Sequence, residues 1–371
     1  MINILVAGDF SPRRRLEKLI LEKKYNEIFA EVKQYTSIAD YSIVNFETTV
    51  VSGEAKPTKK TGPNLKCSKN AIEAIKYAGF DCVTLANNHF YDYGDEGVRD
   101  TLISCKENNI DYVGGGENIT EAEQILYKKF QGKIFAFINF CESEWSIATL
   151  KSGGAASLNP IRNFYQIQKA KKRADYVIVI VHGGVEEYEL PTPRMKEVYR
   201  FFVDAGADAV INHHQHCFSG YEIYNRKPIF YGLGNFCFDW VTQSVEWWEE
   251  GFIVILEFSD QIGFSIYPYV QCHEKAAVIF MKNTSQFDEK IARLNSIIDD
   301  DKRLEECFNN MAISKYKRYS VLLEPYSNRY LNFLYSKRLL PSLVSMERKK
   351  ILLNMVRCES HRDVLLKILQ L

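Results

Sequence analysis

Residues 176–182 read Tyr-Val-Ile-Val-Ile-Val-His, a run of β-branched residues that ends in a histidine. A run that is apolar on both sides predicts a strand buried on both faces of a parallel sheet. Before and after it, over the first two-thirds of the chain, short β-rich runs alternate with helical patterns. This alternation is typical of an α/β sheet, so the sequence predicts an α/β fold.

Polar side chains follow directly after the predicted strands. The first strand, residues 2–7, ends at Gly8-Asp9, and the last, residues 229–233, is followed by Gly234-Asn235-Phe236. The metal-competent residues at such strand ends are Asp9, Glu47, Asn88, His89, His182, His214 and His216. Because the carboxyl ends of strands in open α/β sheets lie along one edge, where ligands bind, we predict a site at that edge.

Imidazoles, carboxylates and an amide oxygen together form a hard-to-borderline ligand set. Such a set suits Mn²⁺, Fe²⁺ or Zn²⁺, with Mg²⁺ as a further option. The pair His214 and His216 could, taken alone, be two exposed imidazoles of a turn; the whole constellation favours metal binding. Five of the seven histidines lie in strand-end motifs, at positions 89, 182, 213, 214 and 216, and the other two, His273 and His361, are expected to be structural or superficial.

Composition excludes several classes of protein. The 371 residues contain 47 Lys+Arg against 47 Asp+Glu, which removes the electrostatic argument for nucleic acid or an anionic membrane as the main partner. No apolar run approaches the roughly 18–20 residues that span a bilayer. The nine cysteines contain no C-x-x-C pair, so neither a disulfide framework nor a cysteine zinc knuckle is indicated. We expect a soluble protein of the cytoplasm.

The composition and the periodicity of the sequence change near residue 280. Residues 286–371 are rich in Leu, Lys, Arg, Glu and Tyr and show helical periodicity. We therefore expect two units, residues 1–279 with the α/β fold and residues 280–371 as a helical extension. Pro325 and Pro341 are expected to separate helices within it.

Basic residues near the strand ends suggest an anionic substrate. Arg13-Arg14-Arg15 follows the first strand closely, and an arginine there, with Arg14 as the candidate, could lie beside such a substrate. The alternative is a solvated start of a helix. Lys56, Lys59 and Lys60, on the loop after Glu47, could contact the substrate in the same way.

Six motifs together resemble one family. In order they are residues 7–9 (AGD), 44–47 (VNFE), 85–89 (LANNH) with 92–94 (DYG), 181–186 (VHGGVE), 205–208 (AGAD) leading into 214–216 (HQH), and 231–236 (YGLGNF). Over residues 1–275 the sequence closely resembles the CapA-type poly-γ-glutamate capsule synthesis proteins, which belong to the calcineurin-like metallophosphoesterase superfamily. The extension is not covered by this resemblance.

The resemblance implies a four-layer αββα sandwich with a metal site at the edge of the paired sheets. It implies metal ligands at Asp9, Glu47, Asn88, His182, His214 and His216, with Glu47 a candidate bridge between two ions. His89 would be a general acid or would stabilise the transition state. Glu186 and Asn235 would orient ligands or touch the substrate.

The chain also departs from the family pattern. The superfamily begins with Asp-x-His, whereas this chain has Asp9-Phe10-Ser11, so one histidine ligand is missing and the site could hold one ion or two. The family's His-Pro-His is His214-Gln215-His216 here, and its His-Trp-Gly is His182-Gly183-Gly184. The identity of the substrate is therefore less transferable than the metal site.

These features lead to a main hypothesis and its rivals. The main hypothesis is a metal-dependent hydrolase whose substrate is an acidic amide-linked polymer, a peptide or a phosphoester. The first alternative is a non-catalytic component of a capsule synthesis complex that binds the polymer and docks biosynthetic protein partners through the C-terminal helices. An ordinary metallophosphatase and an isomerase or epimerase remain further alternatives. None of them involves nucleic acid or a membrane span.

Overall fold

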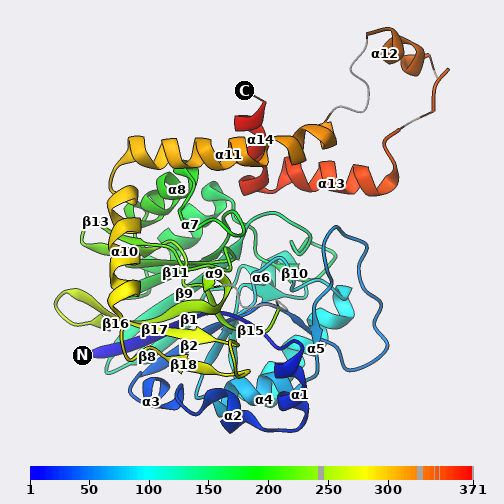
Figure 1. Cartoon of the computed structure of the whole chain (residues 1–371). Helices are drawn as coiled ribbons and strands as arrows, with labels where there is room; N and C mark the ends of the chain where they lie inside the picture. Colours follow the sequence, from blue (N-terminus) through cyan, green and yellow to red (C-terminus); the bar gives the residue numbers. More distant parts are fainter. Residues whose placement is uncertain (241–245, 324–328, 338, 342, 370–371) are drawn as a thin grey trace.

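Two β-sheets packed face to face form the centre of the protein (Figure 1). The computed structural model describes residues 1–240, 246–323, 329–337, 339–341 and 343–369. Within these residues the first sheet has the order β18 (Val278–Phe280), β17 (Ile262–Gln271), β16 (Glu250–Phe258), β1 (Ile2–Ser11), β2 (Tyr41–Phe46), β5 (Cys82–Thr84) and β6 (Asp111–Val113), with β15 (Asn235–Phe238) beside β1. The second has the order β13 (Tyr221–Tyr224), β14 (Lys227–Phe230), β12 (Ala209–His213), β11 (Tyr176–His182), β9 (Lys133–Cys141) and β8 (Leu126–Phe130).

Alternate side chains of β1 face two different layers. Ile4 and Val6 pack in the core between the two sheets, whereas Leu5 and Ala7 pack against helices on the outer face of the first sheet. Those helices are α1 (Arg15–Leu21), α2 (Tyr25–Phe29), α3 (Lys33–Thr36), α4 (Asn70–Tyr77) and α5 (Gly94–Glu107). The period of two residues in a strand produces this division.

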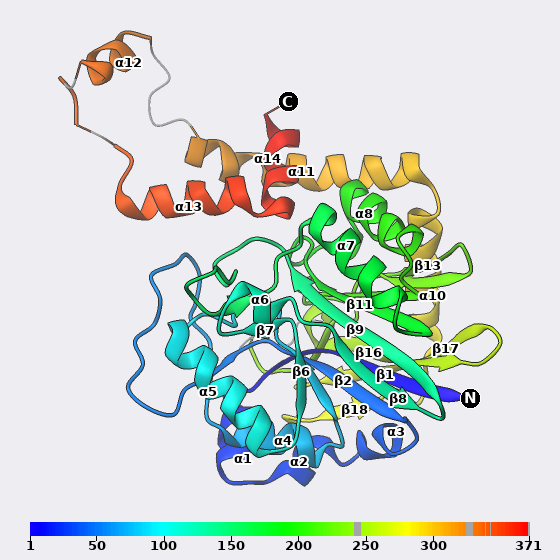
Figure 2. The ribbon, with the colours of Figure 1, turned by 180° about the vertical axis from the view of Figure 1, so that it is seen from behind.

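The outer face of the second sheet is covered by α7 (Pro160–Lys171) and α8 (Pro193–Asp204), seen from behind in Figure 2. Both begin after a side-chain cap, from Asn159 and Thr192, and both have proline in the first turn. The predicted four-layer αββα sandwich is confirmed. Small elements complete it: β3 (Thr49–Val50) with β4 (Lys66–Cys67), β7 (Gly115–Gly116) with β10 (Gly154–Ala155), α6 (Ile119–Ala122) and α9 (Glu246–Glu249).

Two predicted strand ends are wrong. The first strand does not end at Gly8-Asp9 but continues to Ser11, with a shift of register between Asp9 and Phe10. The strand predicted over residues 229–233 ends at Phe230, and Asn235 begins the separate strand β15, which pairs in parallel with β1 and places Asn235 opposite Asp9. The cause is a pairing between segments far apart in the chain, which local patterns do not encode.

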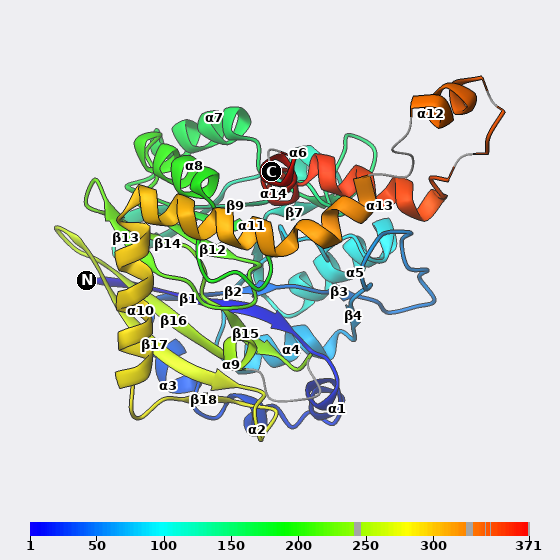
Figure 3. The same ribbon diagram turned by 45° about the horizontal axis from the view of Figure 1, so that its top comes forward.

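The C-terminal region is helical, as predicted, with α10 (Ser285–Ile298), α11 (Asp301–Leu323), α12 (Arg329–Ser336), α13 (Met346–Arg357) and α14 (Glu359–Ile368). Helix α10 packs into the core between the sheets, through Phe287 and Leu294 among others. Helices α11, α13 and α14 lie together across one edge of the sandwich, and α12 projects away from it (Figure 3). Pro341 separates α12 from α13, whereas Pro325 lies outside the described residues. The division into units at residues 279 and 280 remains a proposal.

Of the helices in the described part of the chain, none combines the length and apolar character that crossing a membrane requires. The cytoplasmic location remains a prediction.

Candidate metal centre

Four predicted ligands meet where β2, β5, β11 and β12 end. His182 Nε2 lies 3.0 Å from His214 Nδ1, 3.1 Å from Asn88 Oδ1 and 3.7 Å from Glu47 Oε1. Donor atoms that share one ion, each about 2.1 Å from it, lie roughly 3.0–3.4 Å apart. The spacing of these atoms therefore suits a single divalent cation.

A second group adjoins the first and shares Glu47 with it. His216 Nε2 lies 3.8 Å from Glu47 Oε1, and His216 Nδ1 lies 3.8 Å from Asp9 Oδ2. The donor atoms of Asp9, Glu47 and His216 all lie within 4.8 Å of one another, as do those of Glu47, His182 and His214. The structure thus brings together all six predicted ligands, with Glu47 where a bridging carboxylate would lie.

The Glu47 carboxylate provides the test of whether these residues fit a cation. The side chain is fully buried, and neither of its oxygens has a hydrogen-bond partner within the described residues. Burial raises the pKa of Glu47 well above its usual value, and the charge of Asp9 raises it further. A buried carboxylate in such surroundings is costly unless a positive charge compensates it. The residues therefore fit a divalent cation.

His182 is held in the neutral form that binds metals. Burial and the neighbouring imidazole of His214 lower the pKa of His182 well below its usual value, so this ring is neutral. His214 and His216 both adopt positive φ angles, 93° and 58°. Side chains other than glycine rarely adopt this conformation, and it aims both rings from one short loop at the same centre.

Two asparagines contact side chains of the predicted ligands at hydrogen-bond distance. Asn235 Oδ1 lies 3.0 Å from His216 Nδ1, and its orienting role remains a prediction. Asn45 Nδ2 donates to Asp9 Oδ1 at 2.7 Å and lies 3.2 Å from His182 Nδ1. Asn45 was not singled out from the sequence, although it belongs to one of the motifs. Such outer contacts orient ligands and tune the metal.

His89 lies beside the centre in a small polar network. Its Nδ1 lies 2.7 Å from Asp92 Oδ2 and 3.2 Å from Lys60 Nζ, and Lys60 forms an ion pair with Asp92. Burial and the charge of Lys60 lower the pKa of His89 to about 4. The ring is therefore neutral at physiological pH.

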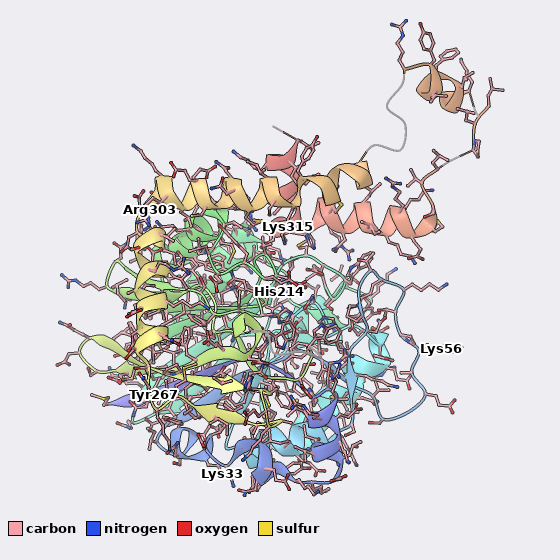
Figure 4. All side chains as sticks on the ribbon, in the orientation of Figure 1. Lys33, Lys56, His214, Tyr267, Arg303 and Lys315 are labelled. Atoms are coloured by element: carbon pink, nitrogen blue, oxygen red, sulfur yellow. The ribbon has the colours of Figure 1, made fainter. Side chains whose placement is uncertain are left out.

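A cavity of about 410 Å³ lies in front of these residues, and both parts of the chain line it. The sandwich contributes Lys60, Asn88, His89, Glu144, Trp145 and Glu186 among others, and the helical extension contributes Lys315, Ile351, Asn354, Met355 and His361. In Figure 4, Lys315 lies on α11 above the sheet edge that carries His214. The extension therefore forms a wall of the candidate site.

This geometry changes two expectations from the sequence, for His361 and Arg14, and adds Glu144, which the sequence did not point to. His361, expected to be structural or superficial, lines the cavity, and the C-x-x-H spacing from Cys358 is the signal that could have identified it. Glu144 was not predicted, and its Oε1 lies 3.7 Å from His214 Nε2. Arg14 is exposed and reaches the carbonyl oxygen of Trp240, and it does not line the cavity.

Comparison with known proteins places the chain in a family. Residues 3–240 match the family described as "Bacterial capsule synthesis protein PGA_cap". The capsule biosynthesis protein CapA of Bacillus anthracis is 35% identical over 246 residues, which are 64% of this chain and 60% of that protein. The PGA biosynthesis protein CapA of Bacillus subtilis is 34% identical over 236 residues, or 63% of this chain and 62% of that protein.

A crystal structure of a phosphatase from Mycoplasma pneumoniae is also similar, with a TM-score of 0.46 and 16% identity, covering 72% of this chain and 93% of that one. The matched region spans somewhat less than two thirds of each CapA relative. With more than half of its length matched by one family, the chain belongs to the bacterial capsule synthesis proteins of the PGA_cap family.

Proposed function

We propose that the chain is a metal-dependent hydrolase of the CapA type, with one or two divalent ions held by Asp9, Glu47, Asn88, His182, His214 and His216. Mn²⁺, Fe²⁺ and Zn²⁺ match these nitrogen and oxygen donors best. A bound ion would supply a Lewis acid for an amide or phosphoryl oxygen and lower the pKa of a water molecule. The buried carboxylate of Glu47, which has no hydrogen-bond partner in the described part of the chain, is the observation that carries the proposal.

His89 moves a proton in this proposal. Its Nδ1 is engaged by Asp92, which leaves Nε2 for exchange with a substrate in the cavity that His89 lines. Asp92 also holds the ring in one orientation. In other enzymes a third group orients the catalytic base beside its nucleophile in the same way. A general acid or base typically contributes about 10²–10⁴-fold to a rate.

Two ammonium groups are available to an acidic substrate in the cavity. Lys60 from the sandwich and Lys315 from the extension line it, beside the carboxylates of Glu144 and Glu186. The two CapA relatives are named for capsule and PGA biosynthesis. We therefore infer that the substrate is an acidic amide-linked polymer or peptide, with a phosphoester as the alternative.

The test is turnover of purified, metal-loaded protein on γ-linked glutamate polymer and on an aryl phosphodiester. His89→Ala is expected to lower turnover about 10²–10⁴-fold while metal content stays unchanged. Glu47→Gln is expected to abolish both the turnover and the binding of metal. His273→Ala is the matched control, because His273 pairs with Glu249 away from the cavity lining. Activity that persists in Glu47→Gln would reject the proposal.

A second candidate is a non-catalytic assembly component of a capsule synthesis complex. Helix α12 favours it, because it projects from the sandwich with Tyr330, Phe333 and Leu334 exposed. Such side chains are typical of surfaces that dock partner proteins. In a strain that depends on this chain for polymer production, normal production by His89→Ala would favour this candidate. Lost production would favour the hydrolase.

A further inference from the structure

A third group of metal-competent side chains lies where the extension meets the sandwich. Donor atoms of Glu144, Cys358 and His361 all lie within 4.8 Å of one another. Glu144 follows β9, whereas Cys358 immediately precedes α14 and His361 lies in its first turn. The group therefore joins two parts of the chain that are more than 200 residues apart.

We propose that Glu144, Cys358 and His361 bind a divalent cation with the ligand preference of zinc, at a site that adjoins the Glu47 centre, since Glu144 also lies 3.7 Å from His214. Thiolate, imidazole and carboxylate are the ligands that zinc takes in proteins. Binding transfers the Cys358 thiol proton to solvent as the metal–sulfur bond forms, so charge and atoms balance. Three protein ligands leave one position open, and the cavity that Glu144 and His361 line lies in front of it.

The spacing of two ligands in the sequence suits one ion. Cys358 and His361 are three residues apart at the start of a helix, so their side chains lie on the same side of the first turn. The Cys358 thiol is buried, with 1% exposure, and lies 3.9 Å from Glu144 Oε1. A buried sulfur next to a carboxylate is therefore already close to the geometry of a metal site.

The backbone around these ligands is fixed by other contacts. Glu359 accepts hydrogen bonds from the backbone nitrogen and hydroxyl of Ser143, and the Ser360 backbone nitrogen donates to Glu142 Oε2 at 3.3 Å. Arg194 bridges Glu142 and Asp363 with ion pairs. A ligand set held by such contacts is preorganised and loses little conformational freedom on binding.

An unpartnered polar side chain in the same cavity supports a bound ligand there. Asn354 lies one turn before Cys358 in α13 and is buried, with an exposed fraction of 7%. Asn354 is one of the residues that line the cavity, and its buried Oδ1 has no hydrogen-bond partner among the described residues. Such an oxygen fits a metal-bound water or the ion itself.

The test is cobalt substitution in the full chain. A Co²⁺–thiolate bond absorbs strongly in the near ultraviolet, and the Glu47 centre contains no sulfur ligand. We expect this absorption band in the wild-type protein. Cys358→Ser is expected to lose the band and to bind one equivalent of cobalt less. His214→Ala is expected to keep the band. Cys307→Ser is the matched control, because it removes another thiol of the extension. Outer contacts of a metal contribute 10–100-fold to affinity, so loss of the ligand in His361→Ala is expected to weaken cobalt binding about 100-fold or more.

Folded wild-type protein that is loaded with cobalt and lacks the band would overturn the proposal, and so would a band that persists in Cys358→Ser. If Cys358→Ser does not fold, the wild-type band and its response to His361→Ala decide the question. The proposal does not rest on hydrolase activity, so an inactive protein with the thiolate band would support this site and reject the hydrolase.

Discussion

Asn235 Oδ1 lies 3.0 Å from His216 Nδ1, and the same side chain donates through Nδ2 to the carbonyl oxygens of His216 and Trp248. Because an amide oxygen only accepts, Nδ1 of His216 carries the ring proton, and Nε2 presents its lone pair toward Glu47, 3.8 Å away. One asparagine therefore fixes both the tautomer of the ring and the strained backbone that carries it. Asn235 is in turn placed by β15, opposite Asp9 in β1.

Asn235→Leu is expected to lower Mn²⁺ affinity about 10–100-fold, because outer contacts of a ligating histidine typically contribute that much. Isothermal titration would measure the dissociation constant. Asn235→Asp is the matched control, because its carboxylate can still accept from Nδ1, and a smaller loss is expected. Equal affinities in wild type and Asn235→Leu would show that His216 does not bind the ion.

Glu47→Gln is expected to stabilise the metal-free protein by about 1–2 kcal/mol while removing its response to metal. The substitution replaces a buried carboxylate, for which the described residues offer no hydrogen-bond partner, with a neutral amide of the same shape. Thermal unfolding with and without a chelator measures both effects. A ligand at 100 times its dissociation constant stabilises a folded protein by about 2.7 kcal/mol, and only the wild type should gain this.

Glu289→Gln, at an exposed site on α10, is the control for this experiment. It should change neither the stability of the metal-free protein nor its stabilisation by metal. A destabilised metal-free Glu47→Gln variant would show that the carboxylate has partners in solution, which would weaken the argument for a cation.

Much of the centre could be predicted because its residues follow individual strands. Glu47, His182 and His214 each occur at the end of a strand whose apolar pattern is readable, and parallel strands bring their carboxyl ends to one edge. The fold class follows from the same alternation of strand and helix patterns. Local sequence is sufficient wherever a residue's position depends on its own strand.

The remaining features depend on contacts between distant segments. The pairing of β15 with β1 joins residues more than 200 positions apart, so the extension of β1 to Ser11 has no local signal. His361 reaches the cavity only because α14 packs against α11 and α13 over the sheet edge. Arg14 follows the first strand in sequence, yet the chain turns there with φ 52° at Arg14 and sends its side chain to Trp240. Proximity in sequence was misleading for Arg14.

Lys290→Met is expected to destabilise the protein by about 1–2 kcal/mol at neutral pH, because Lys290 joins α10 to the sandwich. Its Nζ lies 2.9 Å from Glu189 Oε1 and 3.4 Å from Glu250 Oε2, and 4.3 Å from the centre of the Phe218 ring. Burial lowers the pKa of Lys290, but the hydrogen bond and charge of Glu189, with those of Glu250, outweigh it and raise the pKa above 10.5.

The sign of the pH dependence follows from this direction. A lysine whose pKa is raised by folding stabilises the protein fully below its unfolded pKa and loses that contribution as pH rises through the folded pKa. The difference in free energy of unfolding between wild type and Lys290→Met should therefore narrow from neutral pH to about pH 11. Lys282→Met, at an exposed site just before α10, should show no such difference. A difference that widens with pH would contradict the assignment.

Gly8→Ala is expected to destabilise the protein by about 2–4 kcal/mol and to weaken metal binding as well. A Cβ at residue 8 would lie 1.9 Å from the carbonyl oxygen of Gly234, which also accepts a hydrogen bond from the Asp9 backbone nitrogen at 3.2 Å. A backbone carbonyl cannot rotate away as a side chain can, so β15 must move, and Asn235 and His216 move with it. Gly53→Ala is the matched control, because its Cβ would meet only the Glu96 carboxylate at 3.5 Å.

Denaturant unfolding of both alanine variants gives the free energies, and titration with Mn²⁺ gives the affinities. A loss of affinity in Gly8→Ala that resembles the loss in Asn235→Leu would mean that the pairing of β1 with β15 acts on the metal through Asn235. Lost stability with unchanged affinity would mean that the two strands can separate without disturbing His216. Because Asp9 and Asn235 are paired across these strands, we expect the first result.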